Sequence, residues 1–240
     1  LGRGARLRPG EDPPRPSRMT TVTVGKPIPD LPLGEERVDP RLQWDEADGP
    51  LDLARVFGND RPVELEIGVG KGRFIMLAAA ARPETNFLGL EIAKRFLAKA
   101  MDRVAKRGLA NVRLSDAEAA SFLAERLADG CLAGVHLYFP DPWPKKRHHK
   151  RRIVRPAVLD QMRRTLEPGG LVRVVTDHAD YASAIRKTFD GQPGFSRAAP
   201  DPSLWEIPGM ADYTRPGVTN FEIKFRREGR PIHRMAWHRL

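Results

Sequence analysis

The sequence has almost no cysteine: Cys131 is the single one among 240 residues. One cysteine cannot close an internal disulfide or build a cysteine-based metal cage, and the His148–His149 pair and His178 lack partners at metal-ligand spacing. No apolar run approaches the roughly 18 residues of a membrane span, and no signal-peptide pattern opens the chain. We therefore expect a cytoplasmic protein with no metal centre.

Acidic residues are too few to balance the charge, because 31 Asp and Glu face 41 Lys and Arg and leave a net charge of +10. Such an excess favours polyanionic partners through counterion release. It does not establish nucleic-acid binding, since many basic proteins bind none. The length suits one packed domain with an extension rather than two full domains.

Residues 1–40 lack any hydrophobic period and are rich in Pro and Arg. Such a segment cannot bury enough apolar surface to order itself. We therefore expect a disordered N-terminal extension over residues 1–40 and a single domain over residues 41–240. The extension is either a dispensable tail, which is the simpler interpretation and makes Met19 a candidate start, or an RNA-binding arm.

From Val63 onward, short apolar runs alternate with amphipathic segments, which predicts an α/β fold with a mostly parallel sheet covered on both faces. The predicted strands are Val63–Ile67, Asn86–Glu91, Asn111–Ser115, Leu132–Phe139, Leu171–Thr176 and Ile232–His238. The predicted helices are Phe74–Ala81, Ala93–Arg107, Ala117–Ala128, Arg155–Leu166 and His178–Phe189, with a turn at Pro168–Gly170 and a loop-rich stretch over Gly191–Gly217. A last helix begins at Thr219, because Glu222 three residues later gives capping-box spacing. In such sheets, ligands bind at the carboxyl ends of the strands.

The first strand ends in Glu66, and glycines follow at Gly68, Gly70 and Gly72. Glycines let the backbone turn sharply and approach a ligand closely. A dinucleotide fingerprint would need a glycine where Arg73 stands, and a pyrophosphate would be repelled by a carboxylate at this helix start. A cationic amino group or sulfonium would be attracted by it. The loop therefore favours S-adenosylmethionine over NAD.

Glu91 and Asp116 end the second and third strands. A carboxylate after the second strand can accept from both ribose hydroxyls, and one after the third can meet the adenine amino group. A glycine turn is often only a turn, and Asp116 could simply cap the next helix. Three acids and three glycines at successive strand ends nevertheless indicate a methyltransferase-type nucleoside site.

Asp141 follows the fourth strand and lies between Pro140 and Pro142, which restrict the backbone on both sides. Guanine N7 carries a lone pair and no proton, so its methylation needs alignment rather than a base. A fixed carboxylate facing the transferable methyl can stabilise the charge that develops and accept from guanine N1–H and the 2-amino group. Asp141 is thus the catalytic candidate, although Asp-Pro alone could be a turn, and Trp143 could stack on a base or only pack.

The run Lys145–Arg152 is almost entirely cationic. Beside a candidate active site it predicts contacts with RNA phosphates, although a solvated loop or a localisation signal has the same composition. Asp177, after the fifth strand, could cap the following helix or hold the substrate.

With these residues, the chain resembles the bacterial tRNA (guanine-N7-)-methyltransferase family over about residues 60–240. The similar motifs are Leu65-Glu66-Ile67-Gly68-x-Gly70, Phe87–Glu91, Phe139-Pro140-Asp141-Pro142-Trp143, Lys145, Lys150–Val154, Thr176-Asp177 and Thr219-x-Phe221-Glu222-x-Lys224-Phe225. The resemblance implies a class I methyltransferase fold that uses S-adenosylmethionine to methylate the guanine at position 46, in the variable loop of tRNA. It also implies the role of each candidate residue: Glu66, Gly68, Gly70, Gly72, Glu91, Asp116 and Asp141 at the cofactor, Asp141 as the active-site acid, and Lys145, Asp177, Thr219, Asn220, Phe221 and Glu222 at the substrate.

Two other functions stay open at this point. An adenine amino-group methyltransferase places an Asp-Pro-Pro-Tyr type of motif at the same strand end, but here Trp143 follows a single proline and cations come directly behind. A non-catalytic RNA-binding relict is a third interpretation, against which the intact row of acids argues. No obligate protein partner follows from the sequence, which fits a monomer or a homodimer.

Overall fold

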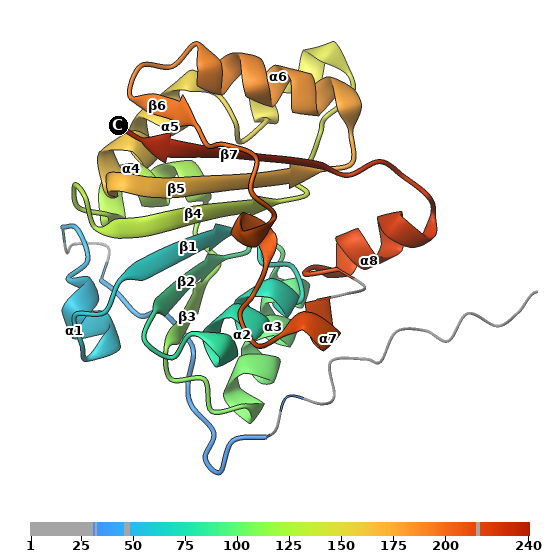
Figure 1. The fold of residues 1–240 in the computed structure, drawn as a ribbon. Coiled ribbons are helices and arrows are strands. Elements are labelled where there is room, and N and C mark those ends of the chain that lie inside the picture. Colours follow the sequence, from blue (N-terminus) through green and yellow to red (C-terminus); the bar gives the residue numbers. More distant parts are fainter. Residues whose placement is uncertain (1–30, 32, 46–48, 215–216) are drawn as a thin grey trace, which may run out of the picture.

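A seven-stranded sheet forms the centre of the computed structural model, which describes residues 31, 33–45, 49–214 and 217–240 (Figure 1). The strand order is β3-β2-β1-β4-β5-β7-β6, with β1 to β5 parallel and β7 antiparallel to both of its neighbours. The strands are β1 Val63–Ile67, β2 Asn86–Leu90, β3 Val112–Ser115, β4 Leu132–Tyr138, β5 Leu166–Thr176, β6 Phe195–Arg197 and β7 His233–Arg239. Within the described residues, no helix is long and apolar enough to cross a lipid bilayer.

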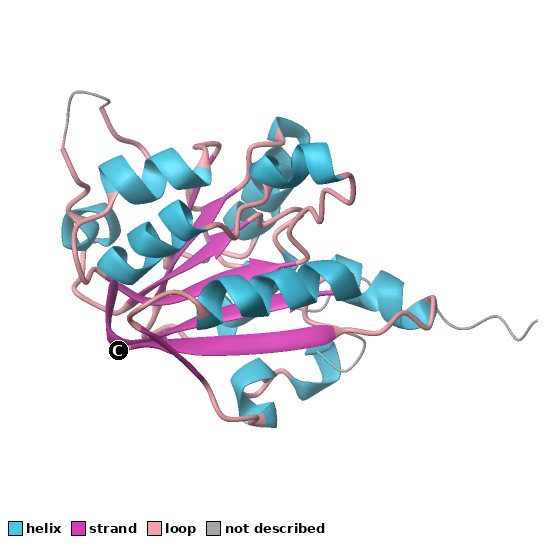
Figure 2. Ribbon diagram, turned by 90° about the horizontal axis from the view of Figure 1, so that it is seen from above, coloured by secondary structure: helices cyan, strands magenta, loops and turns pink. Residues whose placement is uncertain are grey.

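Helices cover both faces of this sheet (Figures 1 and 2). The helices are α1 Leu53–Phe57, α2 Arg73–Ala81, α3 Lys94–Lys106, α4 Ala119–Arg126, α5 Pro156–Thr165, α6 Ala179–Asp190, α7 Ala211–Thr214 and α8 Asn220–Arg227, with 3₁₀ turns η1 Lys146–Arg151 and η2 Pro202–Trp205. One apolar cluster joins the sheet to α1, α4, α5 and α6, and a second joins it to α2, α3 and the segment around η2. Because both faces are covered, β1 and β2 are buried almost along their whole length.

The alternating pattern predicted every strand of the parallel part and its connecting helices to within a few residues. The main difference lies in β5, which starts at Leu166 and includes the predicted turn Pro168–Gly170. Leu132 pairs with Leu166 but Gly134 pairs with Leu171, so the extra residues form a bulge, and Gly169 has φ 82° there. The stretch predicted as loop also contains β6, η2 and α7, which are too short to leave a periodic signal.

An extended segment before α1 lies along the free edge of β3. Leu42 N–H donates to the Leu114 carbonyl at 2.9 Å, and Leu114 N–H donates to the Pro40 carbonyl at 2.7 Å. Gly34 N–H donates to the Lys106 carbonyl at 3.1 Å, and Leu31 is buried. Contacts with the domain therefore begin before residue 41, where the sequence placed the boundary. The disorder predicted for residues 1–30 lies outside the described residues.

The predicted cap of α8 is present. Thr219 Oγ1 accepts from Glu222 N–H at 3.0 Å, and Glu222 Oε2 accepts from Val218 N–H at 3.0 Å, one residue earlier than a regular capping box would place it. Gly229, with φ 66°, follows the helix as predicted. This cap fixes the start of α8 at the same edge of the sheet as the carboxyl ends of the strands (Figure 1).

Candidate active site

The glycine loop after β1 combines two kinds of glycine. Gly68, Gly70 and Gly72 all have positive φ, at 83°, 55° and 75°. A Cβ on Gly72 would lie 2.9 Å from the Ala100 Cβ, whereas a Cβ on Gly68 or Gly70 would meet nothing within 4 Å. Gly72 is therefore needed for packing α2 against α3, while Gly68 and Gly70 expose bare backbone toward open space, where a ligand can approach closely.

Glu66 is 2% exposed just before this loop. It accepts a hydrogen bond from the Ile75 backbone, but its Oε2 has no hydrogen-bond partner within the described part of the chain. Burial, and then the nearby Glu91 carboxylate, raise the pKa of Glu66 well above its usual value. A buried carboxylate oxygen without a partner is costly, so this position suits a ligand that brings a cation or a donor.

Glu91, which follows β2, holds two loops together. Its Oε2 accepts from Gly70 N–H at 2.9 Å, and its Oε1 accepts from Ala93 N–H at 2.8 Å. Each oxygen keeps a further lone pair for a ribose hydroxyl. Ile92, directly beside it, is 69% exposed, which is unusual for so large an apolar side chain. The sequence prediction missed Ile92, because one isolated apolar residue gives no pattern.

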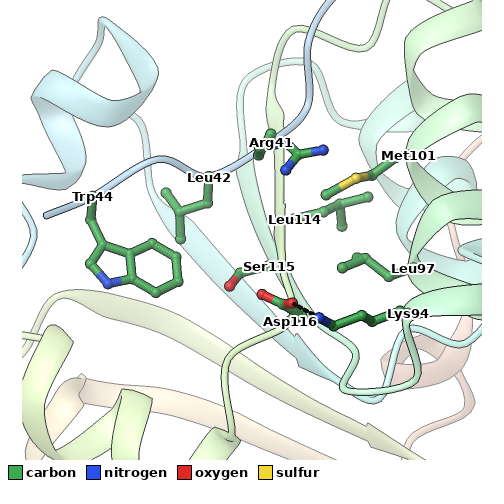
Figure 3. A pocket seen from close by; sticks show the side chains of 9 residues that line it. All are labelled: Arg41, Leu42, Trp44, Lys94, Leu97, Met101, Leu114, Ser115 and Asp116. Atoms are coloured by element: carbon green, nitrogen blue, oxygen red, sulfur yellow. Dashed lines mark ion pairs between the residues drawn. The ribbon is translucent and has the colours of Figure 1, made fainter. Parts of the chain in front are cut away.

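Asp116 is not a helix cap: α4 is capped by Glu118, whose carboxylate accepts from Ser121 N–H at 2.9 Å. The Asp116 carboxylate lies 4.0 Å from Lys94 Nζ at a cavity of about 310 Å³ (Figure 3). This cavity is lined by Arg41, Leu42, Trp44, Lys94, Leu97, Met101, Leu114, Ser115 and Asp116. Its wall formed by residues 41–44 was not predicted, since nothing in the sequence links that segment to β3.

The Asp141 loop is fixed on both sides. Phe139 and Trp143 have φ of 53° and 43°, a conformation that side-chain-bearing residues adopt only when their surroundings impose it. Phe139 N–H donates to the Val175 carbonyl at 2.7 Å, and Arg152 Nε donates to the Pro142 carbonyl at 2.8 Å. Asp141 itself is exposed. The loop therefore presents a solvent-accessible carboxylate from a constrained backbone.

The sheet topology brings the predicted acids to one edge. Because the order is β3-β2-β1-β4-β5, the strand ends carry Asp116, Glu91, Glu66, Asp141 and Asp177 in that sequence along the edge. Within it, Ile67 at the end of β1 pairs with Leu137 near the end of β4. The Asp141 loop therefore leaves the sheet beside the glycine loop.

The predicted substrate residues fall into two groups. Lys145, Asn220 and Phe221 are exposed. Asp177 instead forms an ion pair with Arg230, and the buried Glu222 carboxylate pairs with Arg226 at 2.6 Å and with Arg234. Thr219 is also buried, and its hydroxyl caps α8. Asp177, Thr219 and Glu222 thus have structural partners. The Thr219–Glu222 cap was predicted from the sequence, but the arginine partners of Asp177 and Glu222 were not.

Aromatic contacts join α8 to the Asp141 loop. The Phe139 ring lies 5.4 Å from the Phe225 ring and 6.3 Å from the Phe221 ring, between centroids. On the other side of the loop, the Arg151 guanidinium lies over the half-buried Trp143 ring at 5.0 Å. No residue of η1 is buried. The Asp141 loop thereby lies between α8 and a cationic turn of which all residues but the half-buried His148 are exposed.

A buried polar network that the sequence prediction missed underlies the site. Glu64 Oε2 lies 2.8 Å from both His136 Nε2 and an Arg82 guanidinium nitrogen, and His136 Nδ1 lies 3.2 Å from the Tyr138 hydroxyl. Burial would raise the pKa of Glu64, but hydrogen bonds and charge from His136 and Arg82 outweigh burial and hold it far below its usual range. The network connects α2 and β1 to β4, three residues before Asp141.

Comparison with known proteins agrees with this geometry. A family model described as "Putative methyltransferase" matches residues 60–235. A tRNA (guanine-N(7)-)-methyltransferase of Chromohalobacter salexigens is 36% identical over 228 residues, which cover 95% of this chain and 92% of that protein. One of Nitrosococcus oceani is 33% identical, covering 94% and 92%.

The chain belongs to the tRNA (guanine-N7-)-methyltransferase family. A solved structure, that of the aminoglycoside resistance methyltransferase NpmB1, superposes with a TM-score of 0.52 at 19% identity, covering 85% of this chain and 99% of that one. At that identity the likeness shows the class I methyltransferase fold alone. Membership of the guanine-N7 family and the fold predicted from the sequence are thus both confirmed.

Proposed function

We propose that this protein transfers a methyl group from S-adenosylmethionine to N7 of the guanine at position 46 of tRNA. The observation that carries the proposal is the row of acids along one sheet edge, where the buried Glu66, whose Oε2 has no hydrogen-bond partner among the described residues, precedes the exposed Asp141. The names of the two relatives support the same reaction. We further propose that the protein acts in the cytoplasm, on tRNA and without an obligate protein partner.

The residues at the tips of β1, β2 and β3 fit the cofactor. When bound, S-adenosylmethionine supplies an electrophilic methyl group on a positively charged sulfur. Gly68 and Gly70 leave room for a close approach, and Glu66 offers its partnerless oxygen to a cationic or hydrogen-bonding group. Glu91 is placed to accept from ribose hydroxyls, and Ile92 and Asp116 offer an apolar face and an acceptor to the adenine end.

Asp141 acts on the substrate. It accepts from guanine N1–H and the 2-amino group, so that N7 faces the methyl donor, and its negative charge stabilises the positive ring that forms. No proton has to leave N7, which explains why the loop needs a fixed carboxylate and no histidine. The constrained backbone at Phe139 and Trp143 keeps the carboxylate in place before the RNA arrives.

The exposed residues around Asp141 bind the RNA. Lys145 and the η1 turn contact phosphates, and Asn220 and Phe221 at the start of α8 contact the nucleotide. Asp177, Thr219 and Glu222 hold the α8 segment in position through Arg230, the helix cap and the arginine pairs. Their role in substrate binding is therefore to shape the surface that meets the nucleotide.

A methylation assay tests the proposal. The protein is incubated with radiolabelled S-adenosylmethionine and total tRNA, and the labelled nucleosides are identified after digestion. We expect label in N7-methylguanosine. Label in N6-methyladenosine would instead establish the adenine amino-group reaction, and RNA binding without any label would establish a non-catalytic binding protein.

A further inference from the structure

The outward face of α3 carries an accessible basic surface that the proposed function does not use. We call the exposed Lys94, Arg95 and Lys99 the α3 basic face; the Lys94 side chain is 88% exposed. Leu97, Ala100 and Val104, on the other side of the helix, are buried against the sheet. Among the described residues, neither Arg95 nor Lys99 has an acidic partner within ion-pair distance. Arg95 and Lys99 are therefore directed at solvent and available to an external anion, while Lys94 lies beside Asp116.

The position of these cations opposes ordinary helix electrostatics. Lys94 and Arg95 occupy the first turn of α3, where the helix dipole is positive and acidic residues are favoured. That turn contains no acidic residue, and the N-cap Ala93 makes no side-chain cap. Lys94 Nζ lies 4.0 Å from the Asp116 carboxylate, and the Arg95 guanidinium lies 4.7 Å from the centroid of the Phe96 ring, but neither contact places an acid within the turn itself. Cations that stand against the local preference of a helix are expected at functional sites.

The same arrangement recurs along the edge of the site. The helices that follow β1 to β4, namely α2, α3, α4 and α5, all lack an acidic residue in the first turn. By contrast, α6 and α8 have Asp180 and Glu222 there. The exposed cations of α3 and of η1 thus lie on the two sides of the glycine loop, along the edge that also carries the strand-end acids.

Sheet order separates the two basic surfaces. The α3 helix follows β2 and packs beside β3, while η1 follows β4, and β1 with its glycine loop lies between them (Figure 1). A small anion could contact only one of these two basic surfaces, either the α3 basic face or η1. A folded RNA, with phosphates on both sides of the target base, can contact both at once.

We propose that the α3 basic face is a second phosphate-binding surface for tRNA, on the side of the glycine loop opposite η1, so that the target guanine enters between two phosphate contacts. This inference rests on the proposed function and adds to it the extent of the RNA footprint. It assigns Arg95 and Lys99 to RNA binding, and neither residue belongs to the cofactor site or to the Asp141 loop.

A matched pair of double variants tests it. In Arg95→Gln/Lys99→Gln, two cations of the α3 basic face are neutralised by a residue that keeps the helix. In the control, Arg55→Gln/Lys187→Gln, an equally exposed arginine and lysine are removed from α1 and α6, which cover the other face of the sheet. Binding of full-length tRNA is measured over a series of salt concentrations, and cofactor affinity is measured by calorimetry.

We expect the α3 variant to lower the magnitude of the log Kd against log salt slope by about 1.4–1.8, which is about 0.7–0.9 for each lost phosphate contact. The control should keep the wild-type slope, and both variants should bind S-adenosylmethionine as wild type does. An unchanged slope in the α3 variant, or an equal loss in both variants, would overturn the inference while wild-type methylation of guanine leaves the proposed function intact. A wild-type protein that binds no tRNA would overturn both.

Discussion

The two flanks of the site are built differently. On the cofactor flank, at the tips of β1, β2 and β3, two acids are fixed by the fold: both Glu91 oxygens accept from loop N–H groups, and Glu66 is 2% exposed, while Asp116 is open to solvent. The substrate flank, at the tips of β4 and β5 with α8 and η1, consists of exposed side chains and ion pairs. Asp141 and Lys145 are open to solvent, and Asp177 pairs with Arg230.

The difference indicates how each flank meets its ligand. The cofactor flank is already set by hydrogen bonds of the backbone, so a small ligand can enter without rearrangement. On the substrate flank, cations either face water or pair with acids, so RNA phosphates bind by displacing counterions and by competing with ion pairs. Salt should therefore affect RNA binding strongly and cofactor binding weakly. Three sets of substitutions separate the two flanks.

The Asp141→Ala variant should have the largest effect, and this effect should be confined to the substrate flank. Removing the carboxylate that orients guanine and stabilises its charge should lower the rate of methyl transfer by about 10²–10³-fold or more. Cofactor affinity should stay at the wild-type value, because Asp141 is exposed and we assign the hold on the cofactor to Glu66, Glu91 and the glycine loop. Single-turnover methylation measures the rate of methyl transfer, and calorimetry measures the cofactor affinity. Near-normal turnover would show that Asp141 is not the active-site acid.

The Glu91→Ala variant should weaken ligand binding on the cofactor flank. The change removes two hydrogen bonds to the loops at Gly70 and Ala93 as well as the proposed ribose contact. Because hydrogen bonds to a charged group contribute about 1.5–3 kcal/mol each, we expect cofactor affinity to fall by about 10–100-fold or more. Calorimetric titration measures this loss, and Glu125→Ala on the exposed side of α4 is the control. Equal affinities in the two variants would refute the assignment.

Neutralising Lys145, Lys146 and Arg147 with alanine should have the mildest effect. These exposed cations contribute to RNA binding and not to chemistry, so the salt slope of tRNA binding should fall in magnitude by about 2–3. Methyl transfer at saturating tRNA should be close to wild type. A slope identical to that of wild type would show that the η1 region does not contact phosphates.

Much of this arrangement could be predicted from the sequence. The alternating pattern predicted the parallel strands, and the rule that ligands bind at strand ends selected Glu66, Glu91, Asp116 and Asp141 before any coordinates. The strands follow from the local hydrophobic pattern, and the site residues follow from the direction of the chain, which defines the carboxyl end of each strand. The membership of a guanine-N7 methyltransferase family also followed from short motifs around those residues.

The rest depends on contacts between distant segments. Arg41 and Trp44 line the Asp116 cavity because residues 40–42 pair with the edge of β3, which no local pattern encodes. The partners of Glu64 and Glu222 are likewise set by tertiary packing, and both residues lie in segments that read as an ordinary strand and an ordinary cap. The bulge in β5 was read as a turn, because Pro168–Gly170 has turn composition.

The central claim is that the buried Glu66 carboxylate is paired by the cationic cofactor. Burial and the neighbouring Glu91 raise the pKa of Glu66 in the free protein, and a bound cation lowers it again. Between the lower pKa of the complex and the raised pKa of the free protein, binding must therefore release a proton, and affinity should rise with pH until the raised pKa is passed.

The decisive measurement is calorimetry of S-adenosylmethionine binding in buffers of different ionisation enthalpy, for wild type and for Glu66→Gln, at a series of pH values. We predict that wild type releases more protons than Glu66→Gln below the raised pKa, and that the difference disappears above it. Equal proton release by the two proteins across the series would contradict the pairing of Glu66 with the cofactor.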